Sequence, residues 1–587
     1  MKQFLITVAG VLAGLILFLV IGPIILISMI AASVGQAPAQ PSQMVLALDL
    51  REEMTDQRPQ NPFASLESTQ ALLDIITRID AARTDNSVKG IYVRANTSGM
   101  SSAQAEEIHA ALAAFRESGK FVVAHLQNDG VRMSMPGYAA VAGADEVWLQ
   151  SASEFMPMGL SAEVTFFADT LQRYHVQAQF ETREEYKTFA NSLTQDRFTP
   201  AHREELTSLM TGLYDMMLAS IAADREISVE QARTAVESSP FAAPRAVELR
   251  LVDQLGRPED AARAALARAE NDNAQMVEFT DYRPPARRGG PVIAVVQGEG
   301  PLVTGPEDGD IFSSDAMMES DRISEALLDA SDDSDVRAIV FRVSSPGGSV
   351  VASDQILHAL RTARERGKRI VVSMGDVAAS GGYYVSADAD EIIASAGTVT
   401  GSIGVVGGKL IIGPAMDHYL STNTETVTVG SPLVTMFSST TPFNQAERAA
   451  FAAFIDRSYA EFLNVVAQGR DMTPEQVREV ARGRVWTGQQ ALERGLVDRI
   501  GGFQVAIARA RALAEIDEDA RIQLRYYPTP ENPFEALEGL FGVSAESAEA
   551  LARINAALSD PRVARALTAL REDDAAVRAE SARFEVR

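Results

Sequence analysis

The sequence contains no cysteine and only six histidines among its 587 residues. The absence of cysteine excludes disulfide bonds and any metal site with cysteine ligands. The histidines are scattered, and none of them has the H-x-x-H or H-E-x-x-H spacing of a zinc site. Nothing in their placement indicates a Ser-His-Asp triad, and no metal or other cofactor is expected.

Basic residues are also scarce, since Lys and Arg together number 53 against 79 Asp and Glu. The formal net charge of −26 repels phosphates, which argues against a nucleic-acid partner. Only six of the basic residues are lysines, and arginine does not readily release its proton. A catalytic amine must therefore come from a short set: Lys2, Lys89, Lys120, Lys187, Lys368 and Lys409.

An uncharged apolar run lies near the N-terminus, at residues 4–32. At 1.5 Å per residue, this run is long enough to cross a hydrocarbon core of ~30 Å. We therefore expect residues 1–35 to form a transmembrane anchor, with a cleavable signal peptide as the alternative. Because Lys2 precedes the run, the positive-inside rule predicts a cytoplasmic N-terminus. The bulk of the chain would then lie outside a bacterial inner membrane, in the periplasm.

One serine of the C-terminal half, Ser380, lies among small residues in the stretch DVAASGGYY at 376–384. The stretch follows an apolar, β-branched run at 370–374 and leads into a helical pattern, which indicates a strand that turns sharply into a helix. Such a turn exposes its side chain beside outward-facing N–H groups, which suits a nucleophile. The alternative is an ordinary turn between a parallel strand and a helix.

A second strand–turn–helix unit lies upstream, where AIVFRV at 338–343 ends in SSPGGSV at 344–350. Its glycine pair, Gly347 and Gly348, could turn backbone amides toward a substrate carbonyl. Loops that follow adjacent parallel strands meet at one edge of the sheet, where α/β proteins place their sites. We therefore expect the two loops to form one site.

These two motifs and TVTGSIG at 398–404 occur in the order found in the signal peptide peptidase A family, which the chain resembles. That family comprises serine–lysine membrane proteases within the wider Clp protease and crotonase-like superfamily. The resemblance implies an α/β fold of tandem duplicated Clp/crotonase-like units with mostly parallel sheets, plus an N-terminal transmembrane helix. It also implies ring-shaped homo-oligomers, expected to be tetramers, in the inner membrane.

The part of the chain after the anchor repeats itself. NSVKGIYVR at 86–94 matches SDVRAIVFR at 334–342, which aligns Arg94 with Arg342. Further pairs follow along the chain: Lys120 with Lys368, 145–147 with 390–392, and 251–253 with 496–498. Each copy alternates β-rich and helical runs, so each is expected to be an α/β unit.

The repeats divide the chain into four parts after the anchor. We expect an N-terminal repeat at 44–280, a Pro- and Gly-rich linker at 281–290, and a C-terminal repeat at 291–520. Residues 521–587 are expected to form peripheral helices or a partly disordered tail.

Each repeat lacks one part of a serine–lysine pair. The alignment places Met135 opposite Ser380, with Ser134 adjacent because a gap leaves one residue of ambiguity. It also places Lys187 opposite Pro432. The two repeats therefore carry complementary parts, as expected when two active sites fuse into one across the interface between copies.

The long two-repeat members of the family that the chain resembles take the lysine from the first repeat and the serine from the second. This implies Lys187 and Ser380 as the catalytic pair, and a role for Ser402 in holding the lysine. The family's Gly-x-Tyr-Lys-Ser is replaced here by EEYKT at 184–188, which is a departure. Lys187 by itself could equally be a solvated ion-pair residue. Three other lysines each follow a glycine and are interpreted as turn residues: Lys120, Lys368 and Lys409. Of these, Lys409 is the rival candidate for the base.

The resulting hypothesis is peptide hydrolysis by Ser380 and Lys187. Burial would lower the pKa of Lys187, so that the neutral amine takes the proton of the serine hydroxyl. The N–H groups of Gly348 and Gly381 would meet the oxyanion, and Gly347 would let the backbone approach. Four apolar residues could line the cleft, although core packing would account for most of them: Ile403, Val405, Val406 and Ile411.

Location and resemblance together imply hydrophobic peptides as substrates, notably cleaved signal peptides. Two other functions compete with this one. The first is a membrane-anchored scaffold or assembly protein that has lost catalysis, since fold does not determine function. The second is crotonase-like acyl-CoA chemistry, but it needs a basic site for the CoA phosphates, which a strongly acidic exported domain argues against.

Overall fold

The computed structural model describes most of the chain between residues 40 and 528. The described ranges are 40–57, 70–95, 100–128, 133–270, 273–285, 289–305 and 316–528. All elements below belong to one unit, residues 41–529. The predicted anchor at 1–35 and nearly all of the tail predicted at 521–587 lie outside the described residues.

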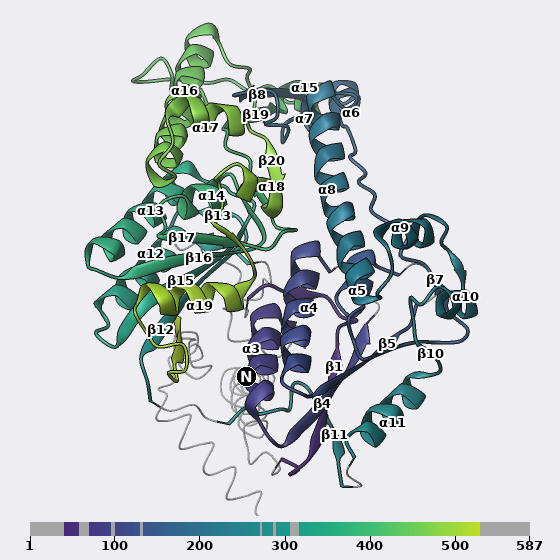
Figure 1. Cartoon of the computed structure of the whole chain (residues 1–587). Helices are drawn as coiled ribbons and strands as arrows, with labels where there is room; N and C mark the ends of the chain where they lie inside the picture. The colour runs from purple at the N-terminus through teal and green to yellow at the C-terminus, as the bar shows by residue number, and fades with distance from the viewer. Residues whose placement is uncertain are drawn as a thin grey trace, which may run out of the picture. The chain divides into compact units, whose positions relative to one another are not determined.

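A six-stranded parallel sheet forms the centre of the first repeat (Figure 1). Its strand order is β10-β6-β5-β4-β1-β11. The central strands are apolar runs buried on both faces, as a parallel sheet covered by helices requires. The bounds are β1 (Met44–Asp49), β4 (Val88–Ala95), β5 (Phe121–Leu126), β6 (Glu146–Leu149), β10 (Gln254–Leu255) and β11 (Gln275–Glu278).

The second repeat builds the same sheet again. Its parallel order β21-β17-β16-β15-β12-β22 corresponds strand for strand to that of the first repeat. Two more strands extend it, β18 parallel to the end of β16 and β20 antiparallel to β18. The bounds are β12 (Val292–Glu299), β15 (Val336–Ser345), β16 (Arg369–Ala379), β17 (Glu391–Ala394), β18 (Val399–Gly401), β20 (Val485–Thr487), β21 (Arg499–Ile500) and β22 (Gln523–Tyr527). The prediction of tandem α/β units with mostly parallel sheets is confirmed.

Helices cover both faces of each sheet. In the first repeat α3 and α4 pack on one face and α11 on the other, and α12, α13 and α19 do the same in the second. Ser101 and Ser349 begin α4 and α13 at equivalent positions, and each side chain accepts the N–H three residues later. The bounds are α3 (Leu72–Thr84), α4 (Ser102–Glu117), α11 (Pro258–Arg268), α12 (Ser320–Asp332), α13 (Val350–Glu365) and α19 (Phe503–Leu513).

Shorter elements and two long helices complete the unit. The strands are β2 (Met54–Thr55), β3 (Gln70–Ala71), β7 (Glu154–Phe155), β8 (Gln177–Thr182), β9 (Phe241–Ala242), β13 (Leu302–Val303), β14 (Met318–Glu319) and β19 (Val406–Ile411). The helices are α5 (Met135–Ala139), α6 (Ala168–Arg173), α7 (Asn191–Thr194), α8 (Pro200–Asp224), α9 (Val229–Glu237), α10 (Ala243–Glu248), α14 (Gly381–Ser386), α15 (Gly413–Leu420), α16 (Gln445–Gly469), α17 (Pro474–Val480) and α18 (Gly488–Glu493).

The duplication extends to single hydrogen bonds. The hydroxyl of Tyr138 donates to Leu251 O at 2.6 Å, and that of Tyr383 donates to Leu496 O at 2.8 Å. These bonds fasten the short helix of each repeat, α5 or α14, to the same later turn. Because both tyrosines are buried, each hydroxyl needs such an acceptor.

Lys120 and Lys368 also occupy equivalent places. They lie in turns, as the sequence indicated, but both are half-buried rather than freely solvated. Each Nζ donates to two backbone carbonyl oxygens of an earlier helix–strand turn: Ala82 and Asp85 for Lys120, Asp333 and Val336 for Lys368. Both ammonium groups therefore have structural partners.

Part of the first repeat leaves its own sheet and lies on the second repeat. Strand β8 pairs antiparallel with β19 along its whole length. Figure 1 shows α8 running from the β8–β19 region back toward α5 and α9. Of the described helices, α8 alone is long and apolar enough to cross a membrane by length and composition, and here it packs against α5, α9 and β20.

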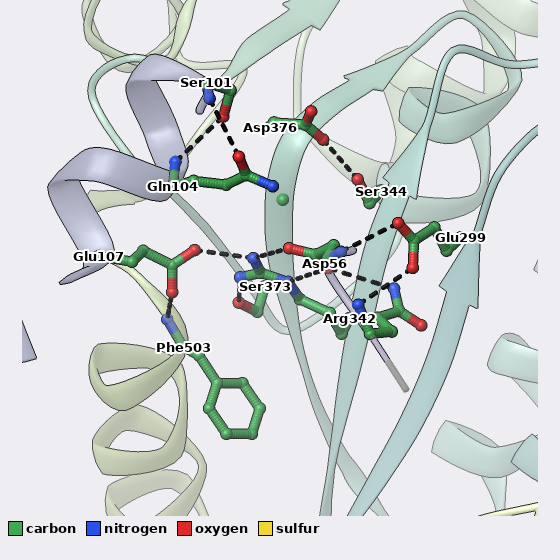
Figure 2. A network of polar contacts seen from close by, with 12 residues as sticks. Asp56, Ser101, Gln104, Glu107, Glu299, Arg342, Ser344, Ser373, Asp376 and Phe503 are labelled. Carbon is green, nitrogen blue, oxygen red and sulfur yellow. Dashed lines mark hydrogen bonds and ion pairs between the residues drawn. The ribbon is translucent and has the colours of Figure 1, made fainter. Parts of the chain in front are cut away.

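A buried polar cluster also joins the two repeats (Figure 2). Arg342 of β15 is fully buried, and its guanidinium pairs with Asp56 and Glu107 of the first repeat. Glu107 also accepts the backbone N–H of Phe503 at 2.7 Å, and Glu299 accepts that of Asp56 at 3.0 Å. Since these carboxylates are shielded from water, the joint between the repeats depends on the charge of Arg342.

Candidate active site

Ser380 stands at the turn between β16 and α14. Its φ of +54° and ψ of −118° are costly for a residue other than glycine. Its N–H donates to Gly401 O at 2.9 Å, which fastens the turn to β18. The residues around Ser380 must be glycines because there is no room for a side chain: a Cβ on Gly347 would lie 2.7 Å from the Cβ of Ser380. Likewise, a Cβ on Gly382 would lie 2.6 Å from Ser345 O.

Lys187 reaches Ser380 from the first repeat. It lies between β8 and α7, and its Nζ is 3.0 Å from Ser380 Oγ. The same Nζ is 2.9 Å from both the carbonyl oxygen and the Oγ of Ser402. A neutral amine has two N–H donors and one lone pair. It can therefore donate twice to Ser402 and accept the hydroxyl proton of Ser380.

Two glycines of the second repeat make room for the turn that carries Lys187. Gly483 has a φ of +78°, and a Cβ there would lie 2.5 Å from Lys187 N. A Cβ on Gly404 would lie 3.3 Å from Lys187 Cδ. The N–H of Tyr186 donates to Arg482 O at 3.2 Å, beside Gly483. The turn is thus packed directly against the backbone of the second repeat.

Burial changes the protonation of Lys187. The residue is 7% exposed, and burial lowers its pKa from 10.5 to about 8, while the charge of Glu205 opposes the shift. At pH 7 such an amine is neutral in about a tenth of the molecules, against fewer than about one in a thousand for an ordinary lysine. The alternative of a solvated ion-pair lysine is wrong, because the side chain is shielded from water.

The glycine loop after β15 lies beside Ser380 and is held by β13. Leu302 N donates to Gly347 O at 3.0 Å, and Ser349 N donates to Leu302 O at 2.9 Å. Within the described part of the chain, the N–H groups of Gly348 and Gly381 donate to no protein acceptor. They are therefore available to a developing oxyanion. Gly347 permits the close approach, since its φ is +101° and a Cβ there would lie 2.7 Å from Gly381 N.

One cleft of about 670 Å³ contains all six site residues expected from the sequence. Much of its remaining lining is apolar: Leu206, Val350, Tyr384, Val405, Val406 and Phe462. Of the four residues expected to line it, Val405 and Val406 do so, whereas Ile403 and Ile411 are fully buried. The cleft can therefore accept apolar side chains next to Ser380.

The other candidates for the base and the nucleophile lie outside the cleft that contains Ser380. Lys409 is in strand β19, not in a turn as interpreted from the sequence, and its Nζ lies 4.3 Å from the centre of the Phe443 ring. In the first repeat, Met135 is 1% exposed at the position that matches Ser380. The neighbouring Ser134 caps α5 by accepting the N–H of Gly137 at 3.2 Å. The hydroxyl next to the matching position of the first repeat therefore serves as a helix cap.

Two residues of this cleft gave no signal in the sequence, Glu205 and His202 of α8. Glu205 is 4% exposed, and burial raises its pKa to about 7. His202 is 9% exposed, and burial lowers its pKa. The partners of Glu205, Thr188 and Val485, lie 17 and 280 positions away, so no local pattern distinguishes this residue. Within the described ranges, no cluster of three or more His, Asp or Glu residues is placed to hold a metal ion.

Known proteins are similar to this chain over most of its length. The family model described as Peptidase family S49 matches residues 114–272 and again residues 362–517, one stretch in each repeat. Protease 4 of Salmonella typhi is 32% identical over 464 residues, which cover 76% of this chain and 73% of that protein. Protease 4 of Haemophilus influenzae is 27% identical over 532 residues, which cover 85% and 84% of the two chains. Serine protease SPPA, chloroplastic, of Arabidopsis thaliana is 24% identical over 491 residues, which cover 82% and 70%. The chain therefore belongs to peptidase family S49 and is a serine protease.

Proposed function

We propose that this serine protease is a membrane-anchored endopeptidase in which Ser380 is the nucleophile and Lys187 the general base. One observation carries the proposal, the distance of 3.0 Å between Lys187 Nζ and Ser380 Oγ. A buried amine with a lowered pKa, within hydrogen-bond reach of a hydroxyl, is what activation of a serine by lysine requires.

In the first step the neutral amine takes the proton of Ser380 while Oγ attacks the scissile carbonyl. The ammonium that forms remains hydrogen-bonded to the two oxygens of Ser402. The N–H groups of Gly348 and Gly381 stabilise the oxyanion, and one such donor contributes ~3 kcal/mol in the transition state. Lys187 then returns its proton to the leaving amine, which leaves an acyl ester on Ser380.

In the second step water hydrolyses this ester. Lys187, neutral again, takes a proton from the attacking water, and the same two N–H groups hold the second oxyanion. Collapse of that intermediate releases the new carboxylic acid and restores the hydroxyl of Ser380. Lys187 therefore serves as base and acid in turn, and no cofactor takes part.

The apolar lining of the cleft favours hydrophobic stretches of extended peptide. The apolar run at 4–32 would anchor the chain in the inner membrane, with its N-terminus in the cytoplasm and the repeats in the periplasm. Signal peptides released into that membrane are the proposed substrates. The resemblance to signal peptide peptidase A also favours a homo-oligomer, with a tetramer as the expected form.

The test is hydrolysis of an unstructured hydrophobic peptide by the full-length protein in detergent. Ser380→Ala and Lys187→Met should each lower kcat/KM by at least about 10³-fold. Two matched controls, Ser134→Ala and Lys409→Met, should retain activity because these residues lie away from Ser380. A serine-reactive fluorophosphonate probe should label Ser380 in the wild type.

Each outcome separates the candidates. Full activity of Lys187→Met would place the base elsewhere. A folded wild-type protein that neither cleaves peptide nor labels at Ser380 would favour the scaffold function instead. The scaffold function is tested because the motif around Lys187, EEYKT at 184–188, departs from the family pattern Gly-x-Tyr-Lys-Ser.

A further inference from the structure

Glu205 of α8 lies behind the turn that carries Lys187. Its Oε1 accepts the backbone N–H of Val485 at 2.8 Å, and its Oε2 accepts the hydroxyl of Thr188 at 3.3 Å. The residue is 4% exposed, so these two bonds replace water around a buried carboxylate. The Glu205 carboxyl group therefore links the two repeats, because Thr188 belongs to the first and Val485 to the second.

The two residues that donate to Glu205 are sequence neighbours of residues that position the Lys187 amine. Thr188 follows Lys187 directly in the chain. Val485 follows Arg484, whose carbonyl oxygen accepts the N–H of Ser402 at 2.7 Å. Ser402 in turn holds Nζ through both of its oxygens. Glu205 therefore connects the lysine-bearing turn to the loop that supports Ser402.

The titratable and charged groups near Glu205 come from three elements. Lys187 lies on the turn before α7, Arg484 on the loop before β20, and His202 one turn earlier on α8 itself. Arg484 has its own partner, since its guanidinium donates to Glu204 at 2.8 Å. The Lys187 amine and the Glu205 carboxylate are thus buried together, and each influences the charge of the other.

We propose that Glu205 is a positioning residue of this site, which keeps Lys187 in register with Ser380 and sets the pH above which the enzyme works. This inference rests on the proposed function of Lys187 as the base. A negative charge close to an amine favours the ammonium form, so Glu205 restrains the loss of the proton that burial promotes. Glu205 therefore holds the amine in place, and its charge lowers activity between about pH 7 and pH 8, where the carboxylate is ionised and Lys187 titrates.

The protonation states give the direction of the effect. Burial raises the pKa of Glu205 to about 7, so the carboxylate is ionised in the range where Lys187, with a pKa of about 8, titrates. Glu205→Gln removes that charge, while the amide oxygen can still accept the N–H of Val485. The pKa of Lys187 should then fall, by about one unit.

The first measurement is the pH profile of kcat/KM for the full-length protein. Glu205→Gln should move the acid limb down by about one pH unit, so that the variant retains more of its maximal rate at about pH 7.5, where the wild-type carboxylate is ionised. The matched control is Asp215→Asn, which removes a negative charge from an exposed position further along the same helix and should leave the limb in place. An unmoved limb in an active Glu205→Gln variant would overturn the inference.

A second measurement does not depend on activity. The protein has only six lysines, so ¹³Cε-lysine labelling allows NMR titration of each amine, with Lys187 assigned by its loss in Lys187→Met. In a Ser380→Ala background, Glu205→Gln should lower the pKa of Lys187 by about one unit. An unchanged pKa would refute the inference even if the protease proposal stands. The two proposals can also fail separately. If Glu205→Gln lowers the pKa of Lys187 but the wild-type protein shows no cleavage that depends on Ser380, the protease proposal is refuted and the inference about Glu205 stands.

Discussion

Burial of Lys187 predicts a stability cost that varies with pH. The pKa of the amine is 10.5 in an exposed chain and about 8 in the folded protein. Between these values the unfolded state binds the extra proton, so the free energy of unfolding rises with pH by about 1.4 kcal/mol per unit. Below pH 8 both states are protonated and the full cost remains. Above pH 10.5 both are neutral and the cost disappears.

The magnitude follows from the two pKa values. A shift of this size corresponds to about 3 kcal/mol of lost stability at pH 7. Lys187→Met keeps the length of the side chain and removes the buried charge. It also removes the donors to the two oxygens of Ser402, which costs about 1 kcal/mol in return. The variant should therefore be about 1–2 kcal/mol more stable than the wild type at pH 7, although it is inactive.

The assay is urea unfolding of both proteins at pH 7, 9 and 10.5, followed by tryptophan fluorescence or circular dichroism. The difference in unfolding free energy should be largest at pH 7 and should shrink as the pH approaches 10.5. Lys409→Met is the control, because its side chain is only half-buried and its removal should produce a weaker dependence on pH. If Lys187→Met is less stable than the wild type by the same amount at every pH, the amine is not a destabilised ammonium and the mechanism loses its base.

Two more predictions concern other parts of the molecule. Arg342→Met would leave Asp56 and Glu107 as buried carboxylates without a counter-charge, and should lower the free energy of unfolding by about 3–5 kcal/mol in a urea titration. Retention of wild-type stability would show that the two acids are neutral. Glu184→Gly relieves a φ of +68° at the position where the resembled family has glycine, and should raise stability by up to about 1 kcal/mol with kcat unchanged. A fall in kcat would instead assign a role to the Glu184 side chain.

Local patterns predicted much of this protein. The strand–turn–helix units at Ser380 and at Gly347 follow from β-branched runs that end in small residues, and both are present. The duplication was visible as matched segments, and the two sheets have the same strand order. The strand pairing of Lys409 was missed, because two glycines before a lysine indicate a turn unless a partner strand such as β8 is known.

Equivalent residues can have different environments, and the sequence does not reveal which. Arg94 and Arg342 match in the alignment of the repeats. Arg94 is partly exposed and donates to Gln127 at 2.8 Å, whereas Arg342 is fully buried between two carboxylates. The difference arises because Asp56 and Glu107 of the first repeat reach Arg342 across the joint between the repeats.

The sequence by itself determined the two α/β units, the turn that exposes Ser380 and the small set of lysines from which a base could come. Its signals act over about ten residues, the length over which side-chain periodicity and turn residues direct the backbone. Only the tertiary structure decided which lysine meets the serine. The contact joins residues 193 positions apart, and it exists because β8 pairs with β19 and because Gly483 leaves space for the incoming turn.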